Sequence, residues 1–274
     1  MRYFIGCLMF CLLTMNTYAT TNDTAIKINW GYKGHISPAH WGALNPSFAL
    51  CANGKMQSPI NISKKVKKQN DQLMIQYQTM LPYILDNGAT KLTLGNEQIV
   101  VNTGHGIQIN YHGDDEKESI IFADRKYHLV QFHFHTPSEN EWHGRAFPLE
   151  IHFVNQSDDG KIAVIGVFAR AGGTNEIIEN IIQHLPTEEK KEIAILDHQI
   201  NPAQLLPIDK DYYHFIGSLT TPPCTEGVQW IVMQDTITAS PAQILQLRQA
   251  TGGVNARPVQ PLNRRKIFFS EGTK

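Results

Sequence analysis

The sequence predicts a mainly β (α+β) protein that folds as a single domain with a few peripheral helices. Short segments rich in β-branched and aromatic residues, ending in Gly, Asn or Asp, follow one another along most of the 274-residue chain. Neither an internal repeat nor a low-complexity linker divides residues 20–274. We therefore expect this whole stretch to form one domain around one core.

Six segments are predicted to be strands because of their alternating or continuous apolar side chains. In chain order they are residues 91–101, 106–113, 127–135, 149–155, 161–170 and 228–235. A short basic run precedes them at residues 63–71. We expect that run to be a solvated loop, because a small cluster of lysines does not make a binding patch by itself.

Two segments are predicted to be helices. In residues 174–185, isoleucine and leucine recur at the spacing of a single helical stripe. In residues 240–253, Ser240 is placed as N-cap, Pro241 stands at the first helical position and Gln243 completes a capping box. Two glycines end this second segment, as is typical of a helix terminus.

The first 19 residues resemble a secretory signal peptide, with a short basic start, the apolar run "YFIGCLMFCLLTM" and Ala19 at a cleavage site. The run is short for a membrane-spanning helix, and an uncleaved anchor is the alternative. We therefore expect an exported protein, periplasmic or secreted, without a membrane span after cleavage. A formal net charge of −1 gives no electrostatic reason to expect nucleic acid as a partner.

Removal of residues 1–19 leaves two cysteines, Cys51 and Cys224, in the mature chain. An even number of cysteines in an oxidising compartment favours a disulfide between them. Two free, buried thiols are the alternative.

The stretch "QFHFHTPSEN", residues 131–140, places His133 and His135 on one face of a predicted strand. The strand at 149–155 places His152 in the same way. If the two strands are neighbours, the three imidazoles converge. Three neutral histidines with an open fourth position are the ligand set of catalytic zinc, whereas structural zinc takes four protein ligands, often cysteines.

Two further polar residues share these faces. Gln131 lies two residues before His133, and Glu150 lies two residues before His152. Each is positioned to accept the second ring N–H of its histidine, which would fix the tautomer that binds metal.

Six motifs in order resemble those of the α-class carbonic anhydrases, especially their bacterial exported members. They are "WGYKG" (30–34), "PAHWGALNPSFALCANGKMQSPINI" (38–62), "NTGHGIQI" (102–109), residues 131–155, "GSLTTPPCTEGVQWIV" (217–232) and "NARPVQPLNRR" (255–265). The resemblance implies an α-carbonic anhydrase domain over residues 20–274, built on a large central, mostly antiparallel twisted β-sheet. It also suggests a homodimer, because bacterial relatives are often dimers.

The resemblance implies a zinc enzyme that reversibly hydrates carbon dioxide to bicarbonate and a proton, through attack by zinc-bound hydroxide. His133, His135 and His152 would be the zinc ligands, and Asn255 would support them with Gln131 and Glu150. Thr220 would orient the hydroxide by donating to Glu139, and His105 would shuttle the proton. The other implied roles are a water chain along Tyr32, Asn102 and Gln108, a bicarbonate contact at Thr221, and an apolar substrate wall of Val154, Val164, Leu219, Val228 and Trp230.

One residue departs from the family pattern. The family segment commonly reads Ser-Glu-His, and here it reads Ser138-Glu139-Asn140. Because asparagine keeps a hydrogen-bonding side chain of similar reach, we expect an effect on local stability more than on chemistry.

Two other functions remain open at this stage. "HFHTPSE" also satisfies the H-x-H-x3-E spacing of cupins, in which Glu139 would itself bind metal. That interpretation leaves the motifs around residues 217–223 and 255–262 unexplained. The second alternative is a secreted zinc-binding or adhesion protein without catalysis.

Overall fold

The computed structural model describes residues 29–63, 66–69, 71–77, 83–86, 91–94, 97–112, 118–195 and 200–272. The expected signal peptide at residues 1–19 lies outside them. No helix in these ranges is long and apolar enough to cross a membrane.

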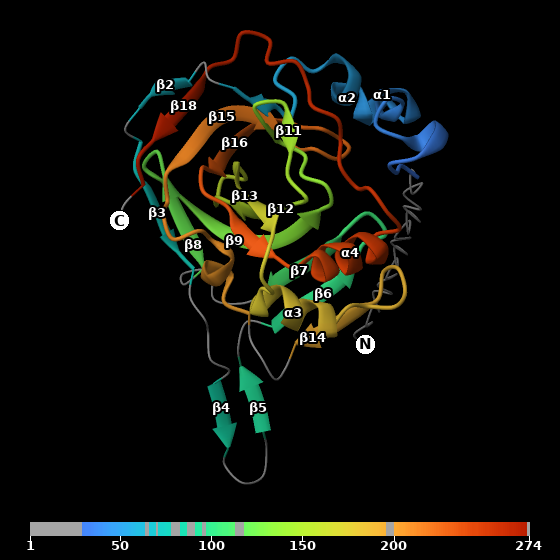
Figure 1. Ribbon diagram of the computed structural model, residues 1–274, viewed down its shortest axis with the longest axis vertical. Helices are drawn as coiled ribbons and strands as arrows, with labels where there is room; N and C mark the ends of the chain where they lie inside the picture. The colour runs from blue at the N-terminus through green and yellow to red at the C-terminus, as the bar shows by residue number, and fades with distance from the viewer. Residues whose placement is uncertain are drawn as a thin grey trace, which may run out of the picture.

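One twisted sheet organises the described part of the chain, and thirteen strands belong to it (Figure 1). Their order is β14-β6-β7-β9-β12-β13-β16-β15-β18-β2, while β17 pairs with β13, and β8 joins β3 to β9. Most neighbours are antiparallel; β13 runs parallel to β16 and β17, and β18 runs parallel to β2. This architecture confirms the predicted fold class.

The strands of this sheet have the following bounds: β2 Val66–Lys68, β3 Leu73–Gln76, β6 Glu97–Asn102, β7 Ile107–His112, β8 Ser119–Phe122, β9 Arg125–His135, β12 Leu149–Gln156, β13 Ile162–Ala171, β14 Glu192–Ile195, β15 Tyr212–Ser218, β16 Glu226–Met233, β17 Ile237–Ala239 and β18 Ile267–Ser270. Two smaller sheets join β1 (Asn61–Ile62) to β10 (Glu141–Trp142) and β11 (Arg145–Ala146), and β4 (Tyr83–Asp86) to β5 (Lys91–Leu94).

Two expectations along the chain were wrong. The segment 91–101 is not one strand: β5 pairs with β4 in a hairpin that extends away from the main sheet, and β6 joins the main sheet (Figure 1). The basic run at 63–71 is not only a loop, because its central residues form the edge strand β2. Exposed lysines on an edge strand discourage unwanted pairing with other chains.

Both predicted helices form. They are α3 (Glu176–Gln183), capped by Asn175, and α4 (Pro241–Ala250), whose capping box of Ser240 and Gln243 is complete. The side chain of Gln243 also bonds to Asn175 and Glu179, so the two helices lie side by side.

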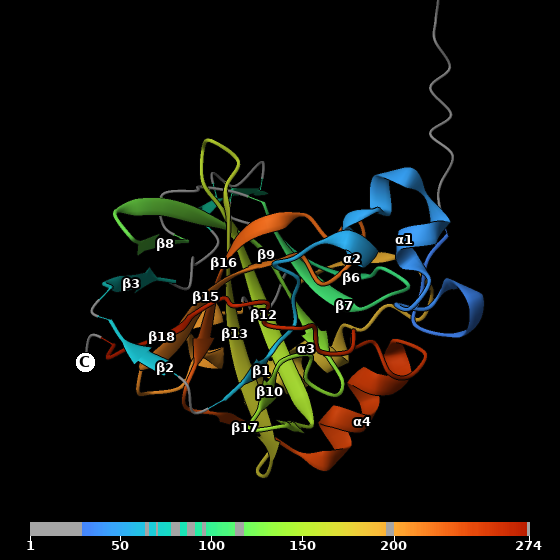
Figure 2. The ribbon, with the colours of Figure 1, turned by 90° about the horizontal axis from the view of Figure 1, so that it is seen from above.

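The remaining helices are short. They are η1 (Gly34–Ile36), α1 (Trp41–Leu44), η2 (Pro46–Phe48), α2 (Leu50–Asn53) and η3 (Pro202–Leu205). Figure 2 shows α1 and α2 on the opposite side of the molecule from β2 and the C-terminus.

The two faces of the central strands have different surroundings. Phe132 and Phe134 of β9 point into the larger apolar core, which also contains Ile178 and Leu247 from the two long helices. Residues on the other face alternate with them and include the histidines. Period-two alternation along β9 and β12 therefore separates the packing side of the sheet from the side that carries the site.

The register aligns the functional side chains in rows. His133 pairs with His152, which pairs with Gly166 on β13. The next row runs from Gln131 through Val154 and Val164 to Trp230. Sheet pairing thus places the polar and apolar parts of the site side by side.

Candidate active site

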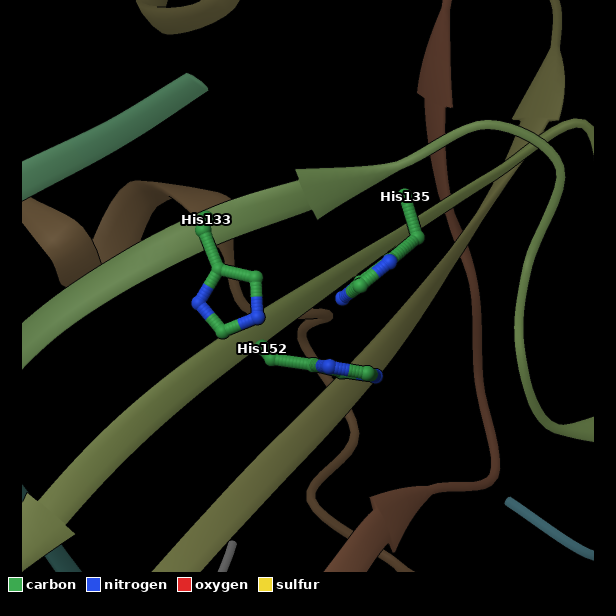
Figure 3. A group of neighbouring side chains, drawn as sticks. All are labelled: His133, His135 and His152. Carbon is green, nitrogen blue, oxygen red and sulfur yellow. The ribbon is translucent and has the colours of Figure 1, made fainter. Parts of the chain in front are cut away.

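The three histidines predicted from the sequence converge. His133 and His135 project from β9 and His152 from β12, and their rings point toward one another (Figure 3). One ring nitrogen from each lies within 4.8 Å of the other two, and no other residue of the described chain joins this group.

Hydrogen bonds fix two of the three tautomers. His133 Nδ1 lies 2.8 Å from Gln131 Oε1, and His135 Nδ1 lies 2.7 Å from the backbone oxygen of Asn255. Both partners are oxygen acceptors, so each Nδ1 carries the proton and each Nε2 keeps a free lone pair. The buried Nε2 of His135 has no hydrogen-bond partner in the described structure.

The third histidine is oriented the other way round. His152 Nε2 lies 3.1 Å from Glu150 Oε1, a charge contact without full hydrogen-bond alignment. A carboxylate at this distance favours the proton on Nε2, which leaves the lone pair on Nδ1. The site therefore offers two Nε2 atoms and one Nδ1 atom.

Burial keeps all three imidazoles neutral. It lowers the pKa of His133 well below its ordinary value, and the neighbouring His135 and His152 add to this. It also lowers the pKa of His135 and of His152. Neutral nitrogen lone pairs facing one point, one of them buried without a partner, fit a borderline cation such as zinc.

Glu139 lies next to this group. Its Oε2 atom is 3.4 Å from His135 Nε2 and 3.9 Å from His152 Nδ1. Its Oε1 atom accepts a 2.8 Å hydrogen bond from the backbone N–H of Arg257. Burial raises the pKa of Glu139 to about 8, against lowering contributions from the Arg257 N–H and from the side chain of Thr220. Thr220 thus faces the carboxyl, although full hydrogen-bond geometry is not formed.

A cleft of about 220 Å³ opens above the histidines. Six residues named from the sequence line it together with His133 and His135; they are Tyr32, His105, Gln108, Gln131, Thr221 and Asn255. His105 also borders a second, outer cavity of about 500 Å³, so its ring lies between the cleft and the surface. The ring stacks on Trp30, with centroids 3.7 Å apart.

Asn102 occupies a different position from the one expected. Among the described residues it does not line the cleft, because its buried amide accepts from Gly104 N–H and donates to the oxygen of Ala250. Thr103, the next residue, lines both cavities. Strand alternation could have suggested this exchange, since adjacent residues point to opposite sides.

An apolar wall borders the histidines on the β13 and β16 side. Val164, Val228 and Trp230 are buried in one cluster, and Val154 and Leu219 pack against it. The ring of Trp230 meets His152 edge to face, with centroids 4.8 Å apart. All five residues expected for an apolar pocket are therefore in one place.

The turn that carries Thr220 and Thr221 is held by the predicted disulfide, which forms between Cys51 and Cys224. Cys224 N–H donates to the oxygen of Thr221 at 2.8 Å. Arg257, which the sequence reasoning did not single out, connects this region to Glu139: its guanidinium donates to Gln57 Oε1, Ser58 O and Cys51 O. A buried arginine has no local sequence signal beyond its place in the motif at 255–265.

The sequence-family model of the eukaryotic-type carbonic anhydrases matches residues 36–271 of this chain. The chain belongs to this family. A carbonic anhydrase of Pectobacterium atrosepticum is 37% identical over 259 residues, which cover 94% of this chain and 98% of that protein. One of Neisseria gonorrhoeae is 40% identical over 240 residues, covering 88% and 87%.

The solved structure of the α-carbonic anhydrase of Thermovibrio ammonificans with the inhibitor sulfanilamide is similar to the present fold. Its TM-score is 0.79 at 38% identity, and the match covers 88% of this chain and 99% of that one. Membership of the carbonic anhydrases makes the chain an enzyme and excludes the cupin alternative. It also agrees with the position of Glu139, which lies beside the three-histidine group and not within it.

Proposed function

We propose that this protein catalyses the reversible hydration of carbon dioxide to bicarbonate and a proton, using Zn²⁺ held by His133, His135 and His152. The observation that carries the proposal is the set of three neutral imidazoles, each with a free lone pair, beside a cleft that His133 and His135 line and next to an apolar cluster whose Trp230 packs against His152. In carbonic anhydrases generally, zinc bound by three histidines lowers the pKa of its water from 15.7 to about 7 and so supplies a hydroxide nucleophile at neutral pH.

Gln131, Glu150 and the backbone of Asn255 hold the three imidazoles in the tautomers that can bind a metal. The oxygens of Gln131 and Asn255 accept hydrogen bonds from the protonated ring nitrogens of His133 and His135, and the Glu150 carboxyl group faces the protonated nitrogen of His152. The opposite ring nitrogens keep free lone pairs.

Thr220 and Glu139 orient the nucleophile. A cation beside Glu139 favours its carboxylate form and opposes the effect of burial on its pKa. A carboxylate can only accept, so the Thr220 hydroxyl must donate its hydrogen to Glu139. Its oxygen is then left to accept from the nucleophile, which fixes one orientation. Thr221, at the wall of the same cleft, is placed to contact the bicarbonate product.

Carbon dioxide is apolar and needs a dry place beside the nucleophile. The wall of Val154, Val164, Leu219, Val228 and Trp230 supplies it. Val154, Val164 and Trp230 of this wall lie in the register row next to that of His152, so apolar side chains lie beside the imidazole.

The proton leaves through His105. Its imidazole can take a proton from ordered water in the cleft and release it to buffer in the outer cavity. Tyr32, Thr103 and Gln108 line the polar side of this route, and Thr103 takes the place that the sequence suggested for Asn102.

We further propose that residues 1–19 direct export to the periplasm or the medium and that the mature enzyme is a homodimer. The signal-like composition of the first 19 residues supports export. N-terminal sequencing of the exported protein, expected to start at Thr20, and its mass in solution test the two statements.

A hydration assay tests the proposed activity. The zinc-loaded protein should hydrate carbon dioxide, and an aromatic sulfonamide should inhibit it. His133→Ala should lose both zinc and activity, because one of three ligands is removed. A folded protein that binds zinc stoichiometrically but leaves the hydration rate at the uncatalysed level would instead identify a non-catalytic zinc-binding protein.

A further inference from the structure

Asn140 lies fully buried behind the three histidines and uses both ends of its amide. Its Nδ2 donates to Glu150 Oε1 at 2.8 Å, and its Oδ1 accepts from the backbone N–H of Ile60 at 3.0 Å. Ile60 precedes β1, which pairs with β10 just after Asn140. The side chain therefore connects the N-terminal segment to the carboxyl group of Glu150.

Glu150 receives most of its donors from this one residue. Its Oε2 atom accepts from the backbone N–H groups of Glu139 and Asn140, each at 2.8 Å. Its Oε1 atom accepts from the Asn140 side chain and lies 3.1 Å from His152 Nε2. Asn140 thus supplies two of the three donors, including the one on the oxygen that faces the histidine.

On its opposite side, the Glu150 carboxyl group has little room to move. Gly166 pairs with His152 in the sheet, and a Cβ atom added there would lie 3.1 Å from Glu150 Oε1. The carboxyl fits between this glycine and Asn140. Among the described residues, the Asn140 side chain is the hydrogen-bond donor to the carboxyl oxygen that faces His152.

We propose that Asn140 is a positioning residue for the metal site: it fixes Glu150 Oε1 against His152 Nε2 and so directs His152 Nδ1 toward the other two ligands. This rests on the proposed zinc function and goes beyond the expected effect on local stability. Histidine, common here in the family, can donate to one partner and accept from another in one tautomer, whereas asparagine does both whatever the pH.

Zinc retention separates positioning from simple stability. The zinc-loaded full chain is transferred into excess dipicolinate, and the zinc that remains bound is followed over time by atomic absorption. Asn140→Asp removes the donor to Glu150 and adds a second carboxyl group beside it, while keeping the side-chain oxygen that faces Ile60. Zinc should leave roughly 10-fold faster or more than from the wild type, the usual scale for loss of a group that orients a metal ligand.

Asn155→Ala is the matched control. Asn155 is fully buried on the same strand as Glu150, and it accepts a 2.8 Å hydrogen bond from the hydroxyl of Tyr77, away from the histidines. This variant should lower the melting temperature and release zinc at nearly the wild-type rate. Asn140→His, which restores a donor, should retain zinc better than Asn140→Asp.

Three outcomes decide the proposal. If the two variants have similar stability, faster zinc release from Asn140→Asp than from Asn155→Ala supports the proposal. Equal zinc release from the two variants overturns it, but does not contradict the proposed hydration of carbon dioxide. If Asn140→Asp does not fold, the smaller Asn140→Ser makes the same comparison. A wild-type protein that binds no zinc would overturn this inference together with the proposed function.

Discussion

At the residue scale, the side chain of His105 lines two neighbouring cavities. It borders both the inner cleft and the outer cavity, and its ring lies flat on Trp30. An indole face stabilises a cation above it, so the stacked position suits the protonated imidazole. In the proposed mechanism, the residue accepts a proton on the inner side and holds it where buffer has access.

Replacement of His105 by alanine should reduce kcat on the order of 10–100-fold in weak buffer, because the proton then has no titratable relay. The ratio kcat/KM should stay near the wild-type value, since hydration precedes this transfer. Stopped-flow hydration assays with and without added imidazole measure both quantities, and imidazole should restore part of kcat.

His35→Ala is the control for this change. His35 is an exposed histidine on η1, close in sequence to Trp30, and it does not line either of the two cavities in the described structure. Equal kcat values for His105→Ala and His35→Ala, with no effect of imidazole, would remove His105 from the mechanism.

At the scale of elements, the turn between β15 and β16 is held by hydrogen bonds and by the disulfide. Leu219 N–H donates to Thr225 O, Gln57 Nε2 donates to Cys224 O, and the disulfide joins Cys224 to α2. The disulfide bridges residues separated by 173 positions. A cross-link of this span removes much conformational freedom from the unfolded chain.

Replacement of Cys51 and Cys224 together by serine should lower the free energy of unfolding by about 2–4 kcal/mol. Urea unfolding of the oxidised protein at constant zinc measures this loss. Wild-type protein treated with a reductant should unfold at the same urea concentration as the double variant. An unchanged midpoint would show that the bond does not stabilise the fold.

The sequence predicts the elements whose pattern is local and strong. Alternation in residues 127–135 and 149–155 predicts β9 and β12 with the correct faces, and the capping residues predict the start of α4. The strand β15 was missed, although its residues pair along β16, because its aromatic segment lies next to a turn motif. Contacts such as Trp30 with His105 depend on the fold, since no local pattern links residues so far apart in the chain.

At the scale of the whole molecule, burial lowers the pKa of four histidines in the described part of the chain: His133, His135, His152 and His214. His214 on β15 is one that lies away from the candidate site: its Nε2 lies 2.7 Å from Gln229 Oε1, and its Nδ1 lies 3.8 Å from Asp71 Oδ2. The rings of Phe122 and Phe268 pack against it. Burial lowers its pKa below the ordinary value, and Gln229 and Asp71 oppose this.

A lowered pKa fixes the sign of the pH effect. The unfolded chain takes up a proton at His214 near pH 6.5 while the folded chain does not, so this part of the stability is complete above pH 6.5 and is lost as the pH falls. The slope for one proton is at most about 1.4 kcal/mol per pH unit.

His214→Gln should therefore make unfolding less dependent on pH between 7 and 5. Urea unfolding of both zinc-loaded proteins at each pH gives the two slopes. Equal slopes would mean that His214 binds its proton equally well in the folded and unfolded states.

The register of the strands in the central sheet offers a way to check a preparation of the protein. His133 faces His152 only in the observed register of β9 and β12, and a slip by one residue would turn His152 toward the apolar core. A chain that is compact but wrongly paired has the same composition and mass as the native one, and lacks the three-nitrogen group. Stoichiometric metal uptake therefore measures the fraction of molecules in a preparation whose strands have paired correctly.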